Sequence, residues 1–368
     1  MTLCLWKGLR MSQPIKKRLP NIDYVKAFAA VAVIAVHFRK NVQPMIPEEA
    51  FGAKSSLFFA ANYQLFISCV PLFLIVTGYL MTNKKVDKKH YMSIVQLYTL
   101  YLLASIATLF LFMFLHDQHF SIQEIFYRIS AFKMVGYAWY VEMYIGLALL
   151  VPFMNIMFDH VTKKQFTYLI GILLFMCSLP SFINNAPFLA DVFYLPNFWV
   201  QMYPILYYSI GSYIRRYDVV RTLRKQDIWL MGLFNIAITL FGIAYNFHYA
   251  DPYAGFTEGY YPSIVVVLQS VTLFVVMMRI PFKTNRLVTA VAKVTLPMYL
   301  MSYMVDKTVY AHLLSMLGDG KKLINYMPVI VLFICVISFI AAYVLDKINQ
   351  LIWKTIQRIP KAEKENIA

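Results

Sequence analysis

The chain of 368 residues is 60% hydrophobic and only 14% charged, with a mean hydropathy of +0.59. A soluble domain carries more charge than this, and 29 Phe and 27 Tyr exclude a disordered chain, because so many aromatic side chains do not stay solvated. The composition predicts an all-α polytopic membrane protein. At about 20 residues per span plus connections, the length allows roughly ten transmembrane helices.

The chain carries a net charge of +16, from 34 Lys and Arg against 18 Asp and Glu. We do not predict a nucleic acid partner, because the basic residues form short clusters between apolar stretches of membrane length, as in loops held on the cytoplasmic side of a bilayer. The cysteines show neither metal-ligand spacing nor a disulfide pattern, and we predict inert thiols and no metal site. They are Cys4, Cys69, Cys177 and Cys335.

Ten apolar segments are predicted to span the membrane. They are 22–38, 57–81, 92–115, 138–158, 165–183, 197–214, 228–247, 261–279, 288–310 and 327–346. If the N-terminus is inside, Lys and Arg on the inner side outnumber those on the outer side by 25 to 8. Both termini are therefore predicted to be cytoplasmic. The predicted organisation is a cytoplasmic segment 1–21, a transmembrane domain 22–346 and a basic cytoplasmic tail 347–368.

The first span contains three ionisable residues, Asp23, Lys26 and His37. Such residues are costly inside a membrane and are functional candidates. Lys26 and His37 are eleven residues apart, which is about three helical turns, so they share one face at a separation of about 16 Å. Asp23 is placed to pair with Lys26. The alternatives are snorkelling of Asp23 and Lys26 at a helix end and an interfacial role for His37.

Two later spans add further candidates. In the second span, Gly78 allows close approach of a neighbouring backbone or of a ligand, and ordinary helix packing is the alternative. The fourth span opens with Trp139, and Glu142 follows within one turn. Glu142 would orient His37 if the two helices are adjacent, or else it is an acid favoured by the helix dipole.

The predicted outer loop 246–262 combines aromatic side chains with Asp251 and Glu258. This combination suits a sugar ring, whereas a membrane-interface aromatic belt is the alternative. The sequence has no GxSxG, no Gly-rich phosphate loop and no HExxH motif. We therefore expect neither nucleoside-triphosphate chemistry nor a serine hydrolase nor a zinc enzyme.

The run from Asn21 to Phe38, in which ten residues separate Lys26 from His37, resembles the opening of the membrane-bound acyltransferase 3 family. Three further segments are similar to that family: Val70–Leu80 with Thr77-Gly78, Trp139–Pro152 with Trp139-Tyr140, and Thr295–Ser302 with Tyr299. The resemblance implies a ten-helix domain that moves an acyl group, usually acetyl, from cytoplasmic acyl-CoA to a hydroxyl of a cell-envelope glycan.

The resemblance also implies roles for individual residues. His37 is the expected catalytic histidine and Lys26 its basic partner. Glu142 is a third catalytic candidate because of its position at the start of the fourth span and not because of the resemblance. The expected substrate-binding residues are Asp23, Thr77, Gly78, Trp139, Tyr140, Tyr299 and Ser302. Many family members carry R-x-x-R after the second span, but this chain has lysines there, which would attract the CoA phosphates as point charges. These lysines are Lys84, Lys85, Lys88 and Lys89. Ser302 occupies the position of a late histidine.

The sequence thus predicts a multi-pass O-acyltransferase, most simply an O-acetyltransferase, of a surface polysaccharide or its lipid-linked precursor, in a bacterial cytoplasmic membrane. It uses acetyl-CoA or another acyl-CoA and no metal. Its partners are the lipid bilayer and a glycan acceptor, with glycan-assembly proteins or a separate acyl-handling protein. Two alternatives stay open: a transporter or exporter of a glycan or small anion, and an inactive relative that acts in assembly.

Overall fold

The computed structural model describes residues 18–184, 192, 194–249 and 261–365, and up to residue 356 it describes their side chains. Within these residues every regular element is helical, as predicted for an all-α protein. The elements are α1 (Pro20–Val42), η1 (Gln43–Met45), η2 (Glu48–Ala50), α2 (Ala53–Phe66), α3 (Cys69–Met81), α4 (Lys88–Leu115), α5 (Ile122–Ser130), α6 (Trp139–His160), α7 (Lys163–Ile183), η3 (Asn197–Met202), α9 (Tyr203–Arg216), α10 (Val219–Thr222), α11 (Lys225–Tyr249), α12 (Ile264–Arg279), α13 (Arg286–Lys293), α14 (Thr295–Leu317), α15 (Gly320–Asn325) and α16 (Met327–Glu365).

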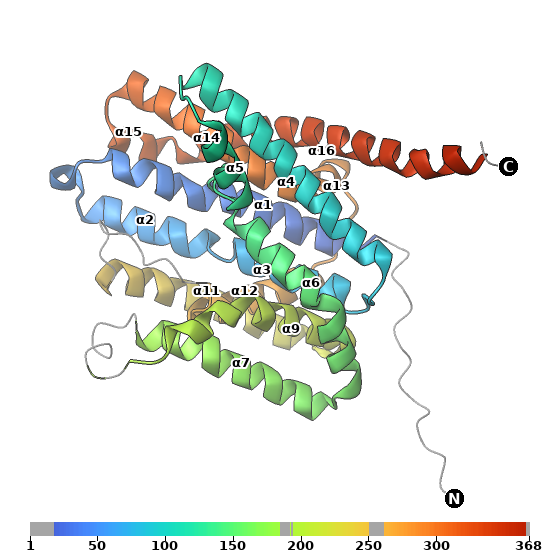
Figure 1. The fold of residues 1–368 in the computed structure, drawn as a ribbon. Coiled ribbons are helices and arrows are strands. Elements are labelled where there is room, and N and C mark those ends of the chain that lie inside the picture. The colour runs from blue at the N-terminus through green and yellow to red at the C-terminus, as the bar shows by residue number, and fades with distance from the viewer. Residues whose placement is uncertain (1–17, 185–191, 193, 250–260, 366–368) are drawn as a thin grey trace, which may run out of the picture.

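The helix α1 lies inside the bundle, where it contacts α2, α3, α12, α13, α14 and α16 (Figure 1). Its middle is the run AAVAVIAV, and small apolar side chains allow neighbouring helices to approach closely. Most of its residues between Ala29 and Phe38 are buried. The predicted candidates Lys26 and His37 are therefore carried by an interior helix rather than by a peripheral one.

Seven helices are long and apolar enough to cross a membrane within the described part of the chain, counting α2 with α3 as one span. The helices α13 and α14 form an eighth candidate that is bent by 76°. Two further predicted spans contain the shorter helices α9 and α12. Each of the ten predicted segments is thus largely helical, but ten crossings remain a prediction.

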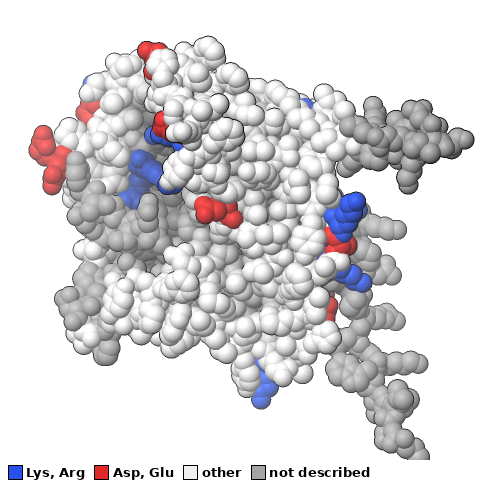
Figure 2. Space-filling view, viewed as in Figure 1, with Lys and Arg blue, Asp and Glu red and all other residues white. Residues whose placement is uncertain are grey.

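The helices run between two ends of the bundle, and α1 begins at the end where α16 leaves it (Figure 1). Lys, Arg, Asp and Glu gather mainly at these two ends on the face shown in Figure 2, apart from one acidic patch nearer the middle. An uncharged band between charged ends is the pattern expected for a protein that crosses a bilayer. The cytoplasmic location of the termini remains a prediction.

The helices α3 and α9 are in close and extensive contact, and two glycines allow their approach. A Cβ atom on Gly78 would lie 2.1 Å from the backbone oxygen of Tyr208, and one on Gly211 would lie 2.1 Å from that of Ile75. Each glycine therefore makes room for the backbone of the other helix, as small residues do between membrane helices. Gly78 faces α9 rather than a ligand, so the packing alternative for this residue is the one that the structure supports.

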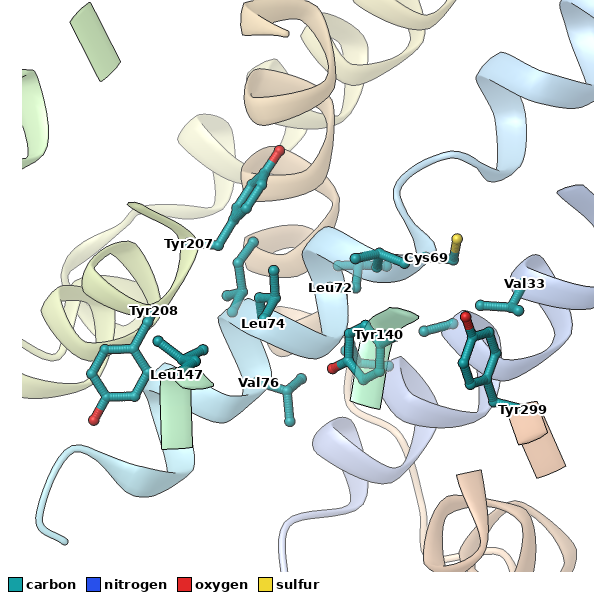
Figure 3. Close-up of a cluster of buried hydrophobic side chains, with 14 of the residues drawn as sticks. Val33, Cys69, Leu72, Leu74, Val76, Tyr140, Leu147, Tyr207, Tyr208 and Tyr299 are labelled. Carbon is teal, nitrogen blue, oxygen red and sulfur yellow. The ribbon is translucent and has the colours of Figure 1, made fainter. Parts of the chain in front are cut away.

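The core continues from this contact toward α1 and α6. Buried side chains from α1, α3, α6, α9 and α14 pack together there (Figure 3). In this cluster Val33 of α1 and Val76 of α3 lie near Tyr140 of α6 and Tyr299 of α14. These four residues also line the cavity described below.

Candidate functional site

A cavity of about 220 Å³ lies between α1, α3, α4, α6 and α14. Its walls are mostly apolar, and Lys26 is the charged residue among those that line it. The lining residues are Lys26, Val33, Val70, Phe73, Val76, Thr77, Leu80, Met81, Leu97, Tyr140, Tyr144, Thr295, Leu296 and Tyr299. Four predicted site residues, Lys26, Thr77, Tyr140 and Tyr299, therefore converge on one cavity.

The half-buried Lys26 is not paired with Asp23 as predicted. The Asp23 carboxylate instead accepts a hydrogen bond from Arg18 Nε at 2.6 Å and one from the hydroxyl of Thr289 at 3.0 Å. Thr289 belongs to α13, which packs against the first turns of α1. Asp23 thus ties α13 to α1, and the ammonium group of Lys26 remains directed to the cavity.

The imidazole of His37 lies next to this cavity but does not line it. Its ring centroid is 3.8 Å from that of Tyr137 and 6.1 Å from that of Tyr299. Tyr299 lines the cavity, and its hydroxyl donates a hydrogen bond to the backbone oxygen of Tyr137. His37 is thus absent from the lining of the Lys26 cavity, and Tyr299 is a lining residue whose ring lies near the imidazole.

Three residues that the sequence analysis missed form a hydrogen-bonded group beside His37. The hydroxyl of Tyr137 donates to Asp306 Oδ2 at 2.7 Å, and Asn41 Nδ2 lies 3.2 Å from the Tyr137 oxygen and 2.9 Å from the backbone oxygen of His37. Asp306 is fully buried. Its only sequence signal was the interruption of an apolar segment, a cost that marks an intramembrane acid as a functional candidate.

The predicted third catalytic residue, Glu142, is exposed on α6. The side chains found beside His37 are those of Tyr137 and Asn41. Trp139 stacks on Tyr261, with ring centroids 5.7 Å apart. Ser302 is buried, and its hydroxyl donates to the backbone oxygen of Tyr299 within α14. Ser302 thus lies on the helix that carries Tyr299. Substrate contact by Trp139 and Ser302 remains a prediction, as does a catalytic role for Glu142.

The predicted donor-binding lysines lie on the turn between α3 and the start of α4. Lys85, Lys88 and Lys89 are exposed and Lys84 is half-buried. This turn follows Leu80 and Met81, which line the cavity. The turn that carries these lysines therefore lies next to the cavity, which Lys26 also lines.

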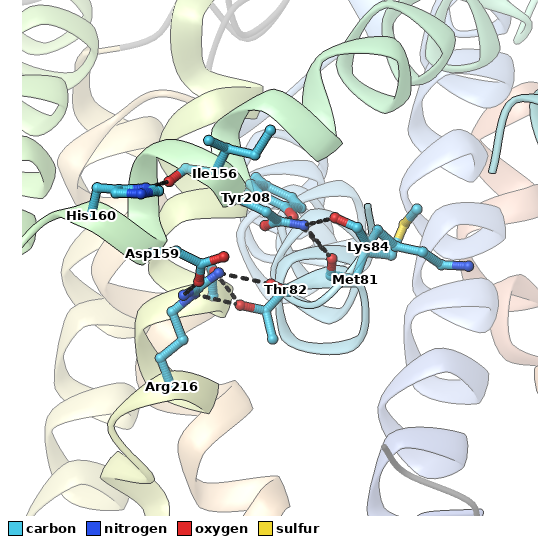
Figure 4. A network of polar contacts seen from close by, with 10 residues as sticks. Met81, Thr82, Lys84, Ile156, Asp159, His160, Tyr208 and Arg216 are labelled. Atoms are coloured by element: carbon cyan, nitrogen blue, oxygen red, sulfur yellow. Dashed lines mark hydrogen bonds and ion pairs between the residues drawn. The ribbon is translucent and has the colours of Figure 1, made fainter. Parts of the chain in front are cut away.

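A polar network anchors the start of this turn (Figure 4). Arg216 of α9 donates to the hydroxyl and the backbone oxygen of Thr82, both at 2.8 Å, and pairs with Asp159 of α6 at 2.5 Å. The amide of Asn155 donates to the backbone oxygens of Met81 and Lys84. These bonds satisfy carbonyl groups at the end of α3 and fix the turn relative to the cavity.

Other predicted features lie partly outside the described residues. Cys4, Asp251 and Glu258 lie outside the described residues, and the role of the loop 246–262 remains a prediction. Three cysteines are buried and unpaired: Cys69, Cys177 and Cys335. The described part of the chain contains no group of three His, Cys, Asp or Glu residues arranged to hold a metal ion. A metal-free reaction remains a prediction.

The architecture is that of a multi-pass membrane protein whose helices enclose a cavity with an intramembrane lysine at one end and a histidine beyond its wall. The sequence of residues 19–347 matches the family model described as an acyltransferase domain, that of the acyltransferase 3 family. The chain therefore belongs to this family, which indicates membrane acyltransferase activity. No curated protein and no solved structure matches the chain.

Proposed function

We propose that this protein transfers an acyl group, in the first instance acetyl, from a cytoplasmic acyl-CoA to a hydroxyl of a cell-surface polysaccharide or its lipid-linked precursor. The observation that carries the proposal is the position of Tyr299, which lines the Lys26 cavity and also approaches His37. A donor in the cavity would thus contact a side chain whose ring centroid lies 6.1 Å from that of the imidazole.

The donor end of the site is the turn with Lys84, Lys85, Lys88 and Lys89. Ammonium groups attract the phosphates of CoA as point charges. The mostly apolar cavity that starts beside this turn suits the acyl end of the donor. Lys26, as the charged group of the cavity wall, would attract an anionic part of the donor, since it lies about three helical turns from His37 and the reacting carbonyl group.

His37 is the proposed general base. Its neutral imidazole takes the proton from the acceptor hydroxyl while that oxygen attacks the thioester carbonyl carbon. The new C–O bond forms, the C–S bond breaks, and the proton passes from the imidazolium to the departing thiolate. The products are an acylated glycan and free CoA, and the imidazole is neutral again.

The acceptor approaches from the outer side in this proposal, since the predicted orientation places His37 nearer the outer end of α1. The protein acts in the bacterial cytoplasmic membrane. It works either alone or with glycan-assembly proteins or a separate acyl-handling partner that passes the group on.

Inside-out membrane vesicles supplied with acetyl-labelled acetyl-CoA test the proposal. We expect label on glycan in vesicles with the wild-type protein and with His312→Ala, since His312 is exposed at the far end of α14. We expect no label with His37→Ala, although that variant still inserts and folds. Label transfer by folded His37→Ala would refute the assigned role, and glycan accumulation without any label would favour a transporter.

A further inference from the structure

Beside His37 the structure places a hydrogen-bonded group of three side chains that come from three distant parts of the sequence. Asn41 lies one turn after His37 on α1, Tyr137 precedes α6, and Asp306 lies within α14. Asn41 donates to the Tyr137 oxygen at 3.2 Å, and Tyr137 donates to Asp306 Oδ2 at 2.7 Å. We propose that Tyr137 is a positioning residue for His37 and that Asn41 and Asp306 fix the orientation of Tyr137.

The rings of His37 and Tyr137 lie against each other. The centroids of His37 and Tyr137 lie 3.8 Å apart and their planes are 31° from parallel, so the phenol ring covers one face of the imidazole. Asn41 also donates to the backbone oxygen of His37 at 2.9 Å. One amide group therefore ties the stacking ring to the helix segment that carries the histidine.

Asp306 is a fully buried acid that contacts Tyr137. Its side chain has no exposed surface, and Oδ1 has no hydrogen-bond partner within the described residues. A buried carboxyl group with an unsatisfied oxygen is costly, and such groups are often retained for a function. In this structure Asp306 accepts bonds from Tyr137 and from Asn41 Nδ2, the latter at 3.3 Å. It therefore fixes the position of the Tyr137 hydroxyl.

This inference rests on the proposed function for its catalytic meaning. When His37 accepts the proton of the acceptor hydroxyl, the ring becomes a cation, and the face of an aromatic ring attracts a cation. A fixed Tyr137 would hold the imidazole plane and also stabilise this charged form. Small displacements of a reacting group can cost about a hundred-fold in rate, so a positioning residue acts mainly on kcat.

Five variants test the role of the group. Tyr137→Phe keeps the ring and loses the hydroxyl, whereas Tyr137→Leu loses both. Asp306→Ala removes the oxygen that accepts the hydrogen bond of Tyr137. Asp306→Asn provides an amide oxygen that can accept this bond again. The matched control is Tyr101→Phe, because Tyr101 is also a fully buried tyrosine whose hydroxyl donates to a backbone oxygen, that of Ile129 at 2.7 Å. Every rate is expressed per folded molecule, with folding measured by thermal unfolding in detergent.

In the labelled acetyl-CoA assay we expect kcat to fall about ten-fold for Tyr137→Phe and Asp306→Ala, and about a hundred-fold for Tyr137→Leu. KM for acetyl-CoA should stay near the wild-type value. Asp306→Asn should recover most of the loss, and Tyr101→Phe should retain wild-type kcat. A kcat near the wild-type value in folded Tyr137→Leu, or no recovery in Asp306→Asn, would overturn the inference.

A second measurement does not depend on the reaction. The rate at which diethyl pyrocarbonate modifies His37 is followed by mass spectrometry of the His37 peptide. We expect a several-fold faster reaction in Tyr137→Leu than in the wild type or Tyr101→Phe. An unchanged rate would reject the positioning role whatever the activity. If the wild type transfers no acyl group, the proposed function fails, and this rate still decides the inference.

Discussion

The hydroxyl of Tyr299 donates a hydrogen bond to the backbone oxygen of Tyr137, and this bond joins the cavity wall to the ring that stacks on the imidazole. Tyr299 comes from α14, whereas Tyr137 precedes α6. The bond therefore connects α14 to the turn before α6 at the point where the proposed donor cavity approaches His37. We expect a donor in the cavity to contact this ring.

Shortening Tyr299 should change which acyl groups are accepted. Tyr299→Ala removes the aromatic wall and lengthens the cavity toward His37, so longer acyl chains gain room there. We expect the ratio of butyryl to acetyl transfer to rise, whereas Tyr299→Phe should keep the wild-type ratio. Competition between the two labelled acyl-CoA donors measures this ratio, and an unchanged ratio in Tyr299→Ala would contradict the assignment of the wall.

Lys26 should act through its charge. Loss of a charged hydrogen-bond partner costs about 1.5–3 kcal/mol, so we expect kcat/KM to fall about ten- to a hundred-fold in Lys26→Ala. Lys26→Arg should be mild because it keeps the charge. Steady-state kinetics with acetyl-CoA gives these values, with Lys293→Ala as the control at an exposed lysine. Equal losses in the alanine and arginine variants would show that side-chain shape decides.

The basic turn should act on donor binding. We expect the double variant Lys88→Ala with Lys89→Ala to raise KM for acyl-CoA, because two exposed cations near the proposed phosphate position are lost. Salt screens exposed charges, so the difference from the wild type should shrink above about 0.5 M salt. The control replaces Lys163 and Lys164, an exposed pair at the start of α7. Similar effects of the two double variants would point to general surface charge.

Glu142 should contribute little to turnover, because its side chain is exposed and other residues surround His37. We expect Glu142→Gln to keep kcat within about two-fold of the wild type, as surface substitutions generally have small effects. The labelled acetyl-CoA assay measures this directly. A loss as large as that of His37→Ala would restore the orienting role that the sequence suggested.

Gly78→Ala should destabilise the bundle. Its Cβ would lie 2.1 Å from the Tyr208 oxygen, and overpacking typically costs about 1–3 kcal/mol. Gly146→Ala is the control, because nothing lies within 4 Å of a Cβ at that position. Thermal unfolding in detergent should show a lower midpoint for Gly78→Ala alone. Equal unfolding midpoints for Gly78→Ala and Gly146→Ala would mean that α3 and α9 can move apart without loss of stability.

Hydropathy alone predicted the helical segments well, because long apolar runs have few other stable forms in a membrane. The family motifs singled out Lys26 and Tyr299, and the structure places both on the wall of one cavity. They did not predict the approach of Tyr299 to His37. The sequence did not reveal the partners of His37, since Tyr137 and Asp306 are 169 residues apart and meet only through packing of α14 against the segment before α6. Nor did it reveal the bend of 76° between α13 and α14.

The close contact of α3 with α9 has an effect on the opposite face of α3. Gly78 and Gly211 bring the two backbones together, while Val76, Thr77 and Leu80 of the same helix form part of the cavity wall. A methyl group added behind α3 would push that wall inward. The width of the proposed donor cavity thus depends on α9, a helix that contributes none of the residues named in its lining.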